Sequence, residues 1–288
     1  MRIAVTGGTG FLGRRVVEHL QVDGQDVVLV VRPGRGPSLA QPGVTVLEVD
    51  FDDPPADLHA RAGHPDVVVH LAWSRLDDGR SSGHLDVELP RHVGMARALA
   101  GDGLRRIVAT GSSAEYGLVH GPVREDAPRA PTLAYGAAKI AFHAALTELA
   151  DETGVELVWA RMFPLCGEDQ PERELLGRLR AAAAAGERTF AMSLGEQLRD
   201  YLDVAAAGRL VAALATHPDA AGVYNVCSGR PISVRRLAEE WCRTNAPDLE
   251  LRLGEVPMPT HESPAFWGDR RRLDTLLDDG SAAATTQP

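Results

Sequence analysis

A tyrosine and the chain's only lysine stand four positions apart, as Tyr135 and Lys139 in the segment YGAAK. On a helix, positions i and i+4 share a face, so the phenol and the ammonium reach the same ligand. Tyrosine titrates near pH 10, and a nearby ammonium is expected to lower this pKa and let the phenol exchange a proton with a substrate. All other Lys and Arg positions are arginine. Since a guanidinium does not replace a compact ammonium, the retained lysine indicates a reactive site.

Two serines, Ser112 and Ser113, directly follow a strand-like run at residues 106–110. The carboxyl end of a parallel strand is where such sheets bind ligands. A hydroxyl there is placed to donate a hydrogen bond to a reacting carbonyl oxygen and to stabilise its developing charge. The alternative for either serine is a cap on the following turn. The residues alone leave the choice between the two serines open.

Three glycines at the spacing GxxGxxG follow the first strand-like run, as Gly7, Gly10 and Gly13 in TGGTGFLG. Glycine permits a tight turn and a close backbone approach to a pyrophosphate. The helix expected next offers free N–H groups and the positive end of its dipole to an anion. This strand, turn and helix at the start of the chain predict a dinucleotide-binding loop.

The end of the second strand selects between dinucleotides. Enzymes that prefer NAD usually place an acid there, whereas this chain reads VVRPGR with Arg32. An arginine at this point is able to pair with a 2′-phosphate, so the sequence favours NADPH, with NAD as the second possibility. The alternative for Arg32 is a solvated charge at a strand end. After the third strand, Asp50 is placed to accept a hydrogen bond from an adenine amino group, beside Phe51.

Strand-like and helix-like segments, which would position these residues, alternate along the first half of the chain. Several strand-like runs are rich in valine and continuous, as expected for strands buried on both faces. The expected strands are residues 2–6, 26–31, 44–49, 66–71, 106–110, 156–160 and 223–226, and the expected helices are residues 13–22, 90–100, 135–153, 172–185, 209–215 and 234–245. This alternation predicts an α/β fold with a doubly wound parallel sheet of the Rossmann type.

The pattern changes after about residue 167, which suggests two domains. Residues 1–167 are expected to form the dinucleotide-binding domain, with residues 203–226 returning to it. Residues 168–202 and 227–280 are expected to form a smaller, mixed substrate-binding domain. Residues 281–288 (SAAATTQP) are small and polar, and we expect a disordered tail.

Composition excludes several classes of function. The net charge is −10 and the pI about 5.5, which argues against a nucleic-acid partner. The 3 cysteines indicate neither a disulfide framework nor a metal site. No apolar run reaches the roughly 20 residues that span a bilayer, and no signal peptide is apparent. A cytoplasmic protein without membrane partners is expected.

Taken together, these motifs make the chain resemble an extended short-chain dehydrogenase/reductase of the NAD-dependent epimerase/dehydratase group. The resemblance runs from Met1 to about Leu277 and rests on several motifs in the same order. These are TGGTGFLG, VDF, HLA, the serine strand ending in YG, YxxxK, RMF, RDYL and YNV. It implies a Rossmann-type sheet with a smaller mixed C-terminal substrate domain, and an NAD(P)-dependent oxidoreductase.

The resemblance also assigns roles to residues. It makes Ser112, four positions before Tyr116, the catalytic serine beside Tyr135 and Lys139, and Ser113 a neighbouring substrate contact. Residues that it places along the cofactor are Phe11, Leu12, Phe51, Leu71, Ala72 and Phe163. Arg199 and Arg271 match regions that meet the pyrophosphate of a sugar nucleotide in relatives. The alternative for Arg199 is a structural ion pair with a local acid such as Asp200.

Departures from the family pattern narrow the reaction. Dehydratases of this family carry an Asp-Glu pair where this chain has Ser113 and Ala114, which argues against 4,6-dehydration. Pro164 replaces an asparagine that is common in relatives. A run beginning at Glu88 (ELPRH) replaces the usual Asn-Val-x-Gly-Thr. The changes at Pro164 and at the run beginning with Glu88 fall at positions that usually contact the substrate in relatives.

The leading hypothesis is NADPH-dependent reduction of a nucleotide-linked 4-keto-6-deoxy sugar to the alcohol. Alternatives are a sugar-nucleotide 4-epimerase with retained NAD, a reductase of another small carbonyl compound, and a cofactor sensor without turnover. The intact Ser112, Tyr135 and Lys139 argue against the sensor. Relatives often form a homodimer through the tyrosine-bearing helix, and the resemblance allows the same here.

Overall fold

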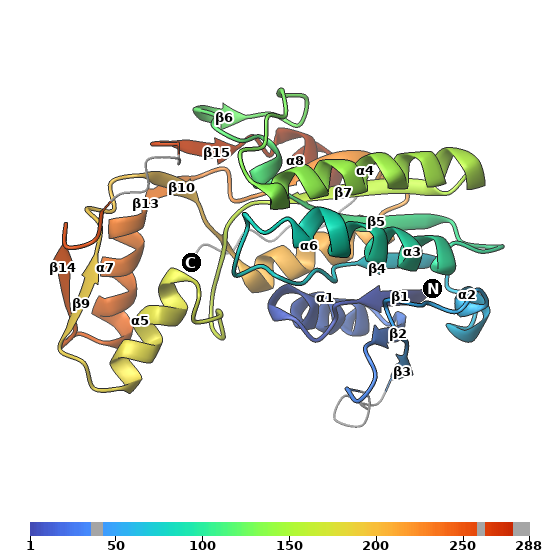
Figure 1. The fold of residues 1–288 in the computed structure, drawn as a ribbon, viewed down its shortest axis with the longest axis horizontal. Helices are drawn as coiled ribbons and strands as arrows, with labels where there is room; N and C mark the ends of the chain where they lie inside the picture. The colour runs from blue at the N-terminus through green and yellow to red at the C-terminus, as the bar shows by residue number, and fades with distance from the viewer. Residues whose placement is uncertain (36–42, 258–262, 279–288) are drawn as a thin grey trace.

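The central element of the computed structural model is a seven-stranded, wholly parallel sheet (Figure 1). The structure describes residues 1–35, 43–257 and 263–278. The strand order is β3-β2-β1-β4-β5-β7-β12, which contains the 3-2-1-4-5 order of a Rossmann fold. The strands are β1 (Arg2–Thr6), β2 (Asp26–Val31), β3 (Val44–Glu48), β4 (Val67–His70), β5 (Arg106–Ser112), β7 (Glu156–Met162) and β12 (Gly222–Val226).

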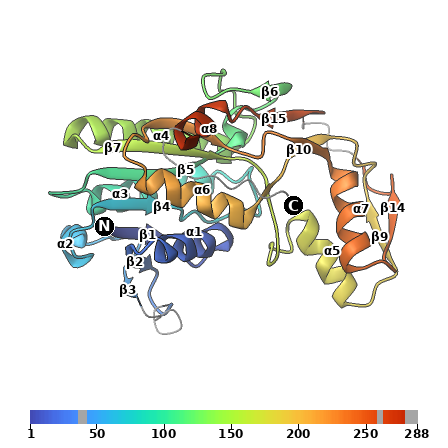
Figure 2. The same cartoon turned by 180° about the vertical axis from the view of Figure 1, so that it is seen from behind.

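Helices cover both faces of this sheet, because alternate side chains of each strand point to opposite sides. Ile3 and Val5 pack on one side with α1 (Phe11–Val22) and α6 (Val204–Thr216). Ala4 packs on the other side with α3 (Leu89–Leu99) and α4 (Ala134–Thr153). Figures 1 and 2 show these two layers from opposite sides of the molecule.

Helix α6 lies along α1, although about 190 residues separate the two helices in the sequence. Their approach is close at Gly208, where a Cβ atom would come within 2.5 Å of the Arg15 Cβ atom. Strand β12 follows α6 and pairs with β7 at the edge of the sheet. Residues far along the chain therefore complete the layer that begins at the N-terminus.

A smaller lobe stands beside the sheet, to the left in Figure 1. It contains α5 (Leu175–Ala184), α7 (Val234–Asn245), and the parallel pair β9 (Thr189–Met192) and β14 (Glu250–Leu253). These elements share a separate hydrophobic core that includes Leu179, Ala238 and Leu249.

Shorter elements complete the fold. The two-stranded pairs are β10 (Leu198–Asp200) with β13 (Pro231–Ser233), β11 (Leu202–Asp203) with β8 (Leu165–Cys166), and β15 (Phe266–Gly268) with β6 (Gly121–Val123). The remaining helices are α2 (Leu58–Arg61), η1 (His84–Glu88), η2 (Ser113–Glu115) and α8 (Arg271–Asp278).

The predicted α/β fold with a doubly wound parallel sheet is confirmed. All seven expected strands and all six expected helices are present, with ends that move by a few residues. Helix α6 shows the largest extension, beginning at Val204 rather than at residue 209. The boundaries of the two domains stay a prediction, and the tail at residues 281–288 lies outside the described residues. Within the described ranges, no helix is long and apolar enough to cross a membrane.

Candidate active site

A cavity of about 770 Å³ opens at the carboxyl ends of β1, β4, β5 and β7. This is the edge at which doubly wound sheets bind ligands, and the volume falls in the usual range for a ligand site. Most of the predicted site residues line it: Gly7, Gly10, Phe11, Leu12, Gly13, Arg32, Phe51, Leu71, Ala72, Ser112, Ser113, Tyr135, Lys139 and Phe163.

The glycine-rich loop between β1 and α1 fits a dinucleotide. Gly7 has φ +73°, a conformation that favours glycine. A Cβ atom at Gly13 would lie 2.1 Å from the Gly7 carbonyl oxygen, so the turn closes only without a side chain there. Gly10 caps α1 without a side-chain hydrogen bond, which leaves the first N–H groups of the helix available to an anion.

Arg32 directly follows β2 and is exposed on the wall of the same cavity. Phe51 lies on this wall as well and is buried. Asp50 is exposed, and its Oδ1 accepts a hydrogen bond from the Asp52 amide at 2.9 Å. Asp50 is not among the residues that line the cavity, so its adenine contact stays a prediction.

Tyr135 and Lys139 stand on one face of α4, in its first two turns, and both line the cavity. Burial raises the pKa of Tyr135 to about 12, and a hydrogen bond with Ser112 opposes this rise. The sequence instead predicts a pKa lowered by the neighbouring ammonium together with a bound oxidised nicotinamide. In the structure the Lys139 ammonium donates to the Thr110 carbonyl oxygen at 2.9 Å and lies 5.8 Å from the centre of the Tyr135 ring. Desolvation therefore prevails, and Tyr135 is a protonated phenol.

Lys139 is buried, with a relative exposure of 2%. Burial lowers the pKa of its ammonium from 10.5 to about 7, while the negative charges of Glu115 and Glu88 oppose this change. An ammonium with a pKa near neutrality is balanced between its charged and neutral forms, so its immediate contacts decide which form is populated.

Ser112 stands at the end of β5, and its hydroxyl has two contacts. Its hydroxyl accepts a hydrogen bond from the Ala114 amide at 3.2 Å, which caps η2. It also forms the hydrogen bond with Tyr135. The cap that the sequence offered as an alternative for Ser112 is therefore present, and its catalytic role stays a prediction. Ser113 lines the cavity as the next residue.

A buried carboxylate fixes the strand end that carries Ser112. Glu115 accepts hydrogen bonds from the Ser112 amide at 2.8 Å and from the Trp159 indole at 3.1 Å. Its other oxygen pairs with the Arg161 guanidinium at 3.0 Å, and both side chains are buried. The carboxylate and its three donors hold β5 and β7 in register beneath the site.

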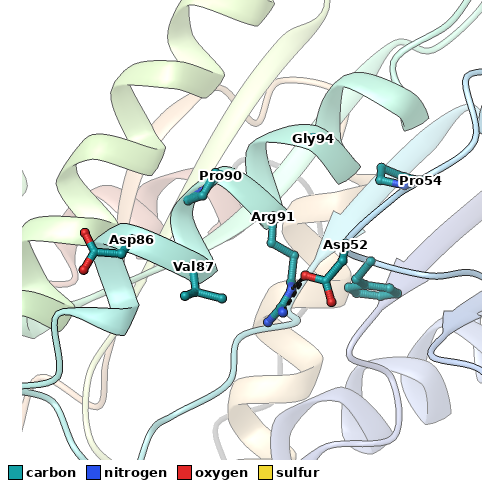
Figure 3. Close-up of a pocket in the computed structure, with 8 residues that line it drawn as sticks. Asp52, Pro54, Asp86, Val87, Pro90, Arg91 and Gly94 are labelled. Carbon is teal, nitrogen blue, oxygen red and sulfur yellow. Dashed lines mark hydrogen bonds and ion pairs between the residues drawn. The ribbon is translucent and has the colours of Figure 1, made fainter.

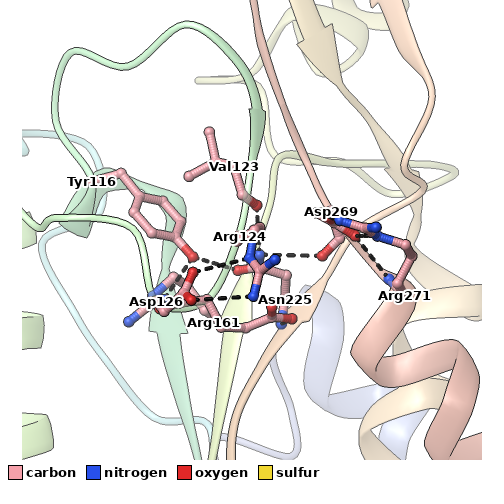
Figure 4. A network of polar contacts seen from close by, with 9 residues as sticks. Tyr116, Val123, Arg124, Asp126, Arg161, Asn225, Asp269 and Arg271 are labelled. Carbon is pink, nitrogen blue, oxygen red and sulfur yellow. Dashed lines mark hydrogen bonds and ion pairs between the residues drawn. The ribbon is translucent and has the colours of Figure 1, made fainter.

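The arginine continues this network away from the cavity (Figure 4). Arg161 donates to the Tyr116 hydroxyl at 2.6 Å, and Tyr116 donates to the Asn225 side-chain oxygen at 2.7 Å. Asn225 in turn donates to the Val123 carbonyl oxygen at 2.9 Å. Tyr116 is thus fully engaged in a structural role, which leaves Tyr135 as the phenol that faces the cavity.

The two arginines predicted to contact substrate do not line the cavity. Arg199 is buried in β10, with its guanidinium 5.2 Å from the centre of the Phe266 ring. Arg271 is exposed at the start of α8, where its Nε donates to Asp269 at 3.0 Å. Their role as substrate contacts stays a prediction.

Asp200 accepts hydrogen bonds from the Ser228 and Gly229 amides. Its buried carboxylate is thus held by backbone groups of the segment that follows β12.

Sequence reasoning missed several cavity residues. Trp73 lines the cavity next to Tyr135, with ring centres 6.3 Å apart. Arg173 lines the cavity from the smaller lobe, and its charge lowers the pKa of Tyr135. The signal for Trp73 was its place directly after the HLA motif. Arg173 lies in a stretch without periodicity and offered none.

A shallower pocket of about 290 Å³ lies between the loop after β3 and the start of α3 (Figure 3). Arg91 on its wall pairs with Asp52 at 2.6 Å and with Glu88 at 2.8 Å. It contains none of the residues that the sequence predicts to be catalytic. The three residues that the sequence predicts to be catalytic all line the larger cavity.

A model of the NAD-dependent epimerase/dehydratase family matches residues 3–227. The chain belongs to this family. It is therefore an NAD(P)-dependent enzyme of the extended short-chain dehydrogenase/reductase type, as the motifs predict.

The chain is also similar to individual relatives and to a solved structure. The chain is 32% identical to dTDP-6-deoxy-L-talose 4-dehydrogenase (NAD(P)(+)) of Kitasatospora kifunensis, over 100% of this chain and 96% of that protein. It is 26% identical to dTDP-6-deoxy-L-talose 4-dehydrogenase (NAD(+)) of Aggregatibacter actinomycetemcomitans, over 93% and 99%. Among solved structures, the UDP-N-acetylglucosamine 4-epimerase of Methanobrevibacter ruminantium superposes with a TM-score of 0.80 at 25% identity, over 96% of this chain and 91% of that chain.

Proposed function

We propose that this member of the epimerase/dehydratase family is an NADPH-dependent reductase that converts a nucleotide-linked 4-keto-6-deoxy sugar to its alcohol. The observation that carries the proposal is that Ser112 at the end of β5 and Tyr135 and Lys139 at the start of α4 line one cavity. Reduction of a ketone requires a proton donor at the carbonyl oxygen, and a phenol with a pKa of about 12 is protonated at neutral pH.

The two relatives named dTDP-6-deoxy-L-talose 4-dehydrogenases support the sugar and the position of reaction. Dehydrogenation at C4 yields a 4-keto sugar, so the reverse direction is reduction of a 4-keto group. The names differ in cofactor, NAD(+) for one relative and NAD(P)(+) for the other. Arg32, in the place of the usual acid at the end of β2, favours NADPH for this chain.

Residues of this chain would divide the reaction as follows. A nicotinamide bound in the cavity would supply the hydride for the keto carbon. Tyr135 gives its proton to the keto oxygen, and Ser112 donates a hydrogen bond to the same oxygen. Lys139 would hold a ribose hydroxyl of the cofactor. The product is the alcohol, with one hydride and one proton added across the carbonyl.

The extent of the cavity favours a large substrate. Beyond the residues around Tyr135, the lining continues through Pro164 to Gln170, Arg173 and Glu174 of the segment before α5. An arginine on this wall suits the negative charge of a sugar nucleotide. A small aldehyde or ketone would need neither this length nor this charge, which argues against a reductase of small carbonyl compounds.

A sugar-nucleotide 4-epimerase is the second candidate, and the likeness to the UDP-N-acetylglucosamine 4-epimerase structure favours it. An epimerase regenerates its cofactor in each cycle and keeps NAD bound. A reductase consumes reduced cofactor and releases the oxidised form. The two candidates therefore differ in what copurifies with the protein and in whether external NADPH is consumed.

The test begins with the purified protein and its nucleotide content. We expect an empty site, tighter binding of NADPH than of NADH by nicotinamide fluorescence, and loss of absorbance at 340 nm when a dTDP-4-keto-6-deoxyhexose is added with NADPH. Copurified NAD, together with interconversion of UDP-glucose and UDP-galactose without added cofactor, would replace the reductase by the epimerase.

A further inference from the structure

The Lys139 ammonium lies against the face of an aromatic ring. Its Nζ atom is 3.9 Å from the centre of the Trp73 ring, compared with 5.8 Å for Tyr135 and 5.9 Å for Phe142. An ammonium within about 6 Å of an indole face is attracted by the ring quadrupole, and tryptophan is the strongest aromatic partner. The ammonium thus lies closer to the Trp73 ring centre than to those of Tyr135 and Phe142, and it donates to the Thr110 carbonyl oxygen at 2.9 Å.

The Trp73 ring is held in place by two histidines. Its indole Nε1 donates to His84 Nδ1 at 3.1 Å, and the other nitrogen of His84 faces the Asp78 carbonyl oxygen at 3.0 Å. An indole N–H is a donor only, so His84 Nδ1 is an acceptor and its Nε2 carries the proton. The His92 ring stacks on the indole with centres 4.7 Å apart and an angle of 17°. The indole plane is therefore fixed independently of any ligand.

A row of hydrogen bonds runs from Glu88 through His92 and His70 to Thr6. His92 Nε2 faces Glu88 Oε2 at 3.2 Å, and His92 Nδ1 faces His70 Nε2 at 3.0 Å. This row of hydrogen bonds ends at the Thr6 hydroxyl, which lies 3.1 Å from His70 Nδ1. Burial is the main cause that lowers the pKa of both histidines, and the charge of Lys139 contributes.

The Glu88 carboxylate, at the other end of this row of hydrogen bonds, is ionised. Hydrogen bonds from His92 and Ser74, with the charge of Arg91, outweigh burial and bring the pKa of Glu88 to about 2. An ionised Glu88 accepts from His92, so every hydrogen bond in the row points toward the carboxylate and both imidazoles stay neutral. The charged groups that act on Lys139 are thus Glu115 from η2 and Glu88 from η1.

We propose that Trp73 is a positioning residue for Lys139, whose indole face keeps the ammonium charged and turned toward the cavity. A buried ammonium needs partners for its three donors. Thr110 takes one of them, and the ring stabilises the charge without taking up another donor in a hydrogen bond. Donors are thereby left for a hydroxyl of a bound ligand. The proposal rests on the role of Lys139 in the proposed function, but it does not depend on the identity of the sugar.

The single lysine of the chain makes a direct test possible. Protein grown with [ε-¹³C]lysine gives one side-chain methylene signal, and its titration reports the pKa of Lys139 without substrate or cofactor. In the wild type we expect the methylene protons to resonate upfield of free lysine, because the ε-carbon is bonded to the Nζ atom that lies over the indole ring. The upfield shift tests the contact even if a substituted chain fails to fold. Its absence would overturn the proposal.

Substitutions then separate the ring face from the bulk of the side chain. Trp73→Leu removes the π face, and we expect loss of the upfield shift and a Lys139 pKa lower by roughly one unit. Trp73→Phe keeps a π face and should retain most of both. Trp241→Leu, a tryptophan change in α7 of the smaller lobe, is the matched control and should leave the signal unmoved. An unchanged pKa in folded Trp73→Leu would contradict the proposal.

Kinetics provide the second readout. Loss of the ammonium at high pH ends catalysis, so a lower Lys139 pKa moves the basic limb of the kcat profile of Trp73→Leu to lower pH. A uniform loss of activity without movement of this limb would indicate only a packing role. If no 4-keto sugar is reduced, the proposed function fails, while the titration of the labelled lysine still decides the role of Trp73.

Discussion

The Glu115 carboxylate accepts a hydrogen bond from the Ser112 amide at 2.8 Å, at the end of β5. The same carboxylate pairs with Arg161, and both partners are buried. A local hydrogen bond at the end of β5 is thus tied to an ion pair that reaches β7. The position of Ser112 therefore depends on a buried charge that does not line the cavity.

Removing this charge is expected to destabilise the protein strongly. Glu115→Gln leaves the Arg161 guanidinium buried without a counter-ion, and such a loss typically costs about 3–5 kcal/mol. The free energy of unfolding, measured by urea denaturation, gives the value. Glu152→Gln is the matched control, because Glu152 pairs with Arg97 at the surface, where an ion pair contributes less than about 1 kcal/mol. Equal losses in the two variants would contradict the structural role.

Tyr135→Phe is expected to lower kcat by about 10²- to 10⁴-fold, because it removes the proton donor. Binding of the cofactor should change little, since the phenyl ring keeps its place on α4. Tyr224→Phe is the control. Tyr224 stands in β12, and its hydroxyl accepts a hydrogen bond from the Ala221 backbone amide at 3.3 Å. Steady-state rates and fluorescence titrations of both variants provide the comparison. A phenylalanine variant with wild-type kcat would assign proton transfer to another group.

Arg32→Gln is expected to weaken NADPH binding by about 10- to 100-fold, the range for a lost hydrogen bond to a charged group. NADH binding should stay unchanged, because NADH carries no 2′-phosphate. Arg209→Gln on the exposed side of α6 changes the net charge equally and serves as the control. If Arg32→Gln weakens both cofactors to the same extent, the side chain does not discriminate between them.

The buried pair of His70 and His92 is expected to make stability depend on pH. Both histidines have a lowered pKa when folded and titrate near pH 6.5 when unfolded. The unfolded chain therefore binds more protons below pH 6.5, and the stability that is complete above this pH is lost as the pH falls. Each histidine contributes up to about 1.4 kcal/mol per pH unit.

The measurement is urea denaturation between pH 7.5 and 5. This range stays above the unfolded pKa of Glu88, 4.5, so Glu88 adds little to the slope. His92→Gln removes one titrating group and should flatten the dependence on pH, whatever its effect on stability at pH 7.5. If the free energy of unfolding changes with pH equally in the wild type and in His92→Gln, His92 does not stay neutral in the folded protein.

Patterns that repeat over a short stretch could be predicted from the sequence. Continuous valine-rich runs gave the sheet, and the glycine spacing gave the turn that closes at Gly13. The i, i+4 spacing placed Tyr135 and Lys139 on one face of α4. In each case the physical cause lies within a few residues, so the pattern is visible without the fold.

Contacts between distant segments could not be predicted in this way. His70 and His92 stand 22 positions apart, and only the packing of α3 against β4 brings their rings together. The direction of the Lys139 side chain likewise depends on Trp73, which follows another strand. The raised pKa of Tyr135 comes from burial, which the spacing of residues does not report.

The close approach of α6 to α1 has a consequence for synthesis of the chain. Leu20 and Val17 of α1 share a core with Leu210 and Val211 of α6, so the cofactor-binding helix lacks its apolar partner until residue 216 has been made. Contacts of such long sequence separation are slow to form, because a long loop must close first. We expect the nascent N-terminal half to remain incompletely folded on the ribosome and to depend on chaperones until α6 emerges.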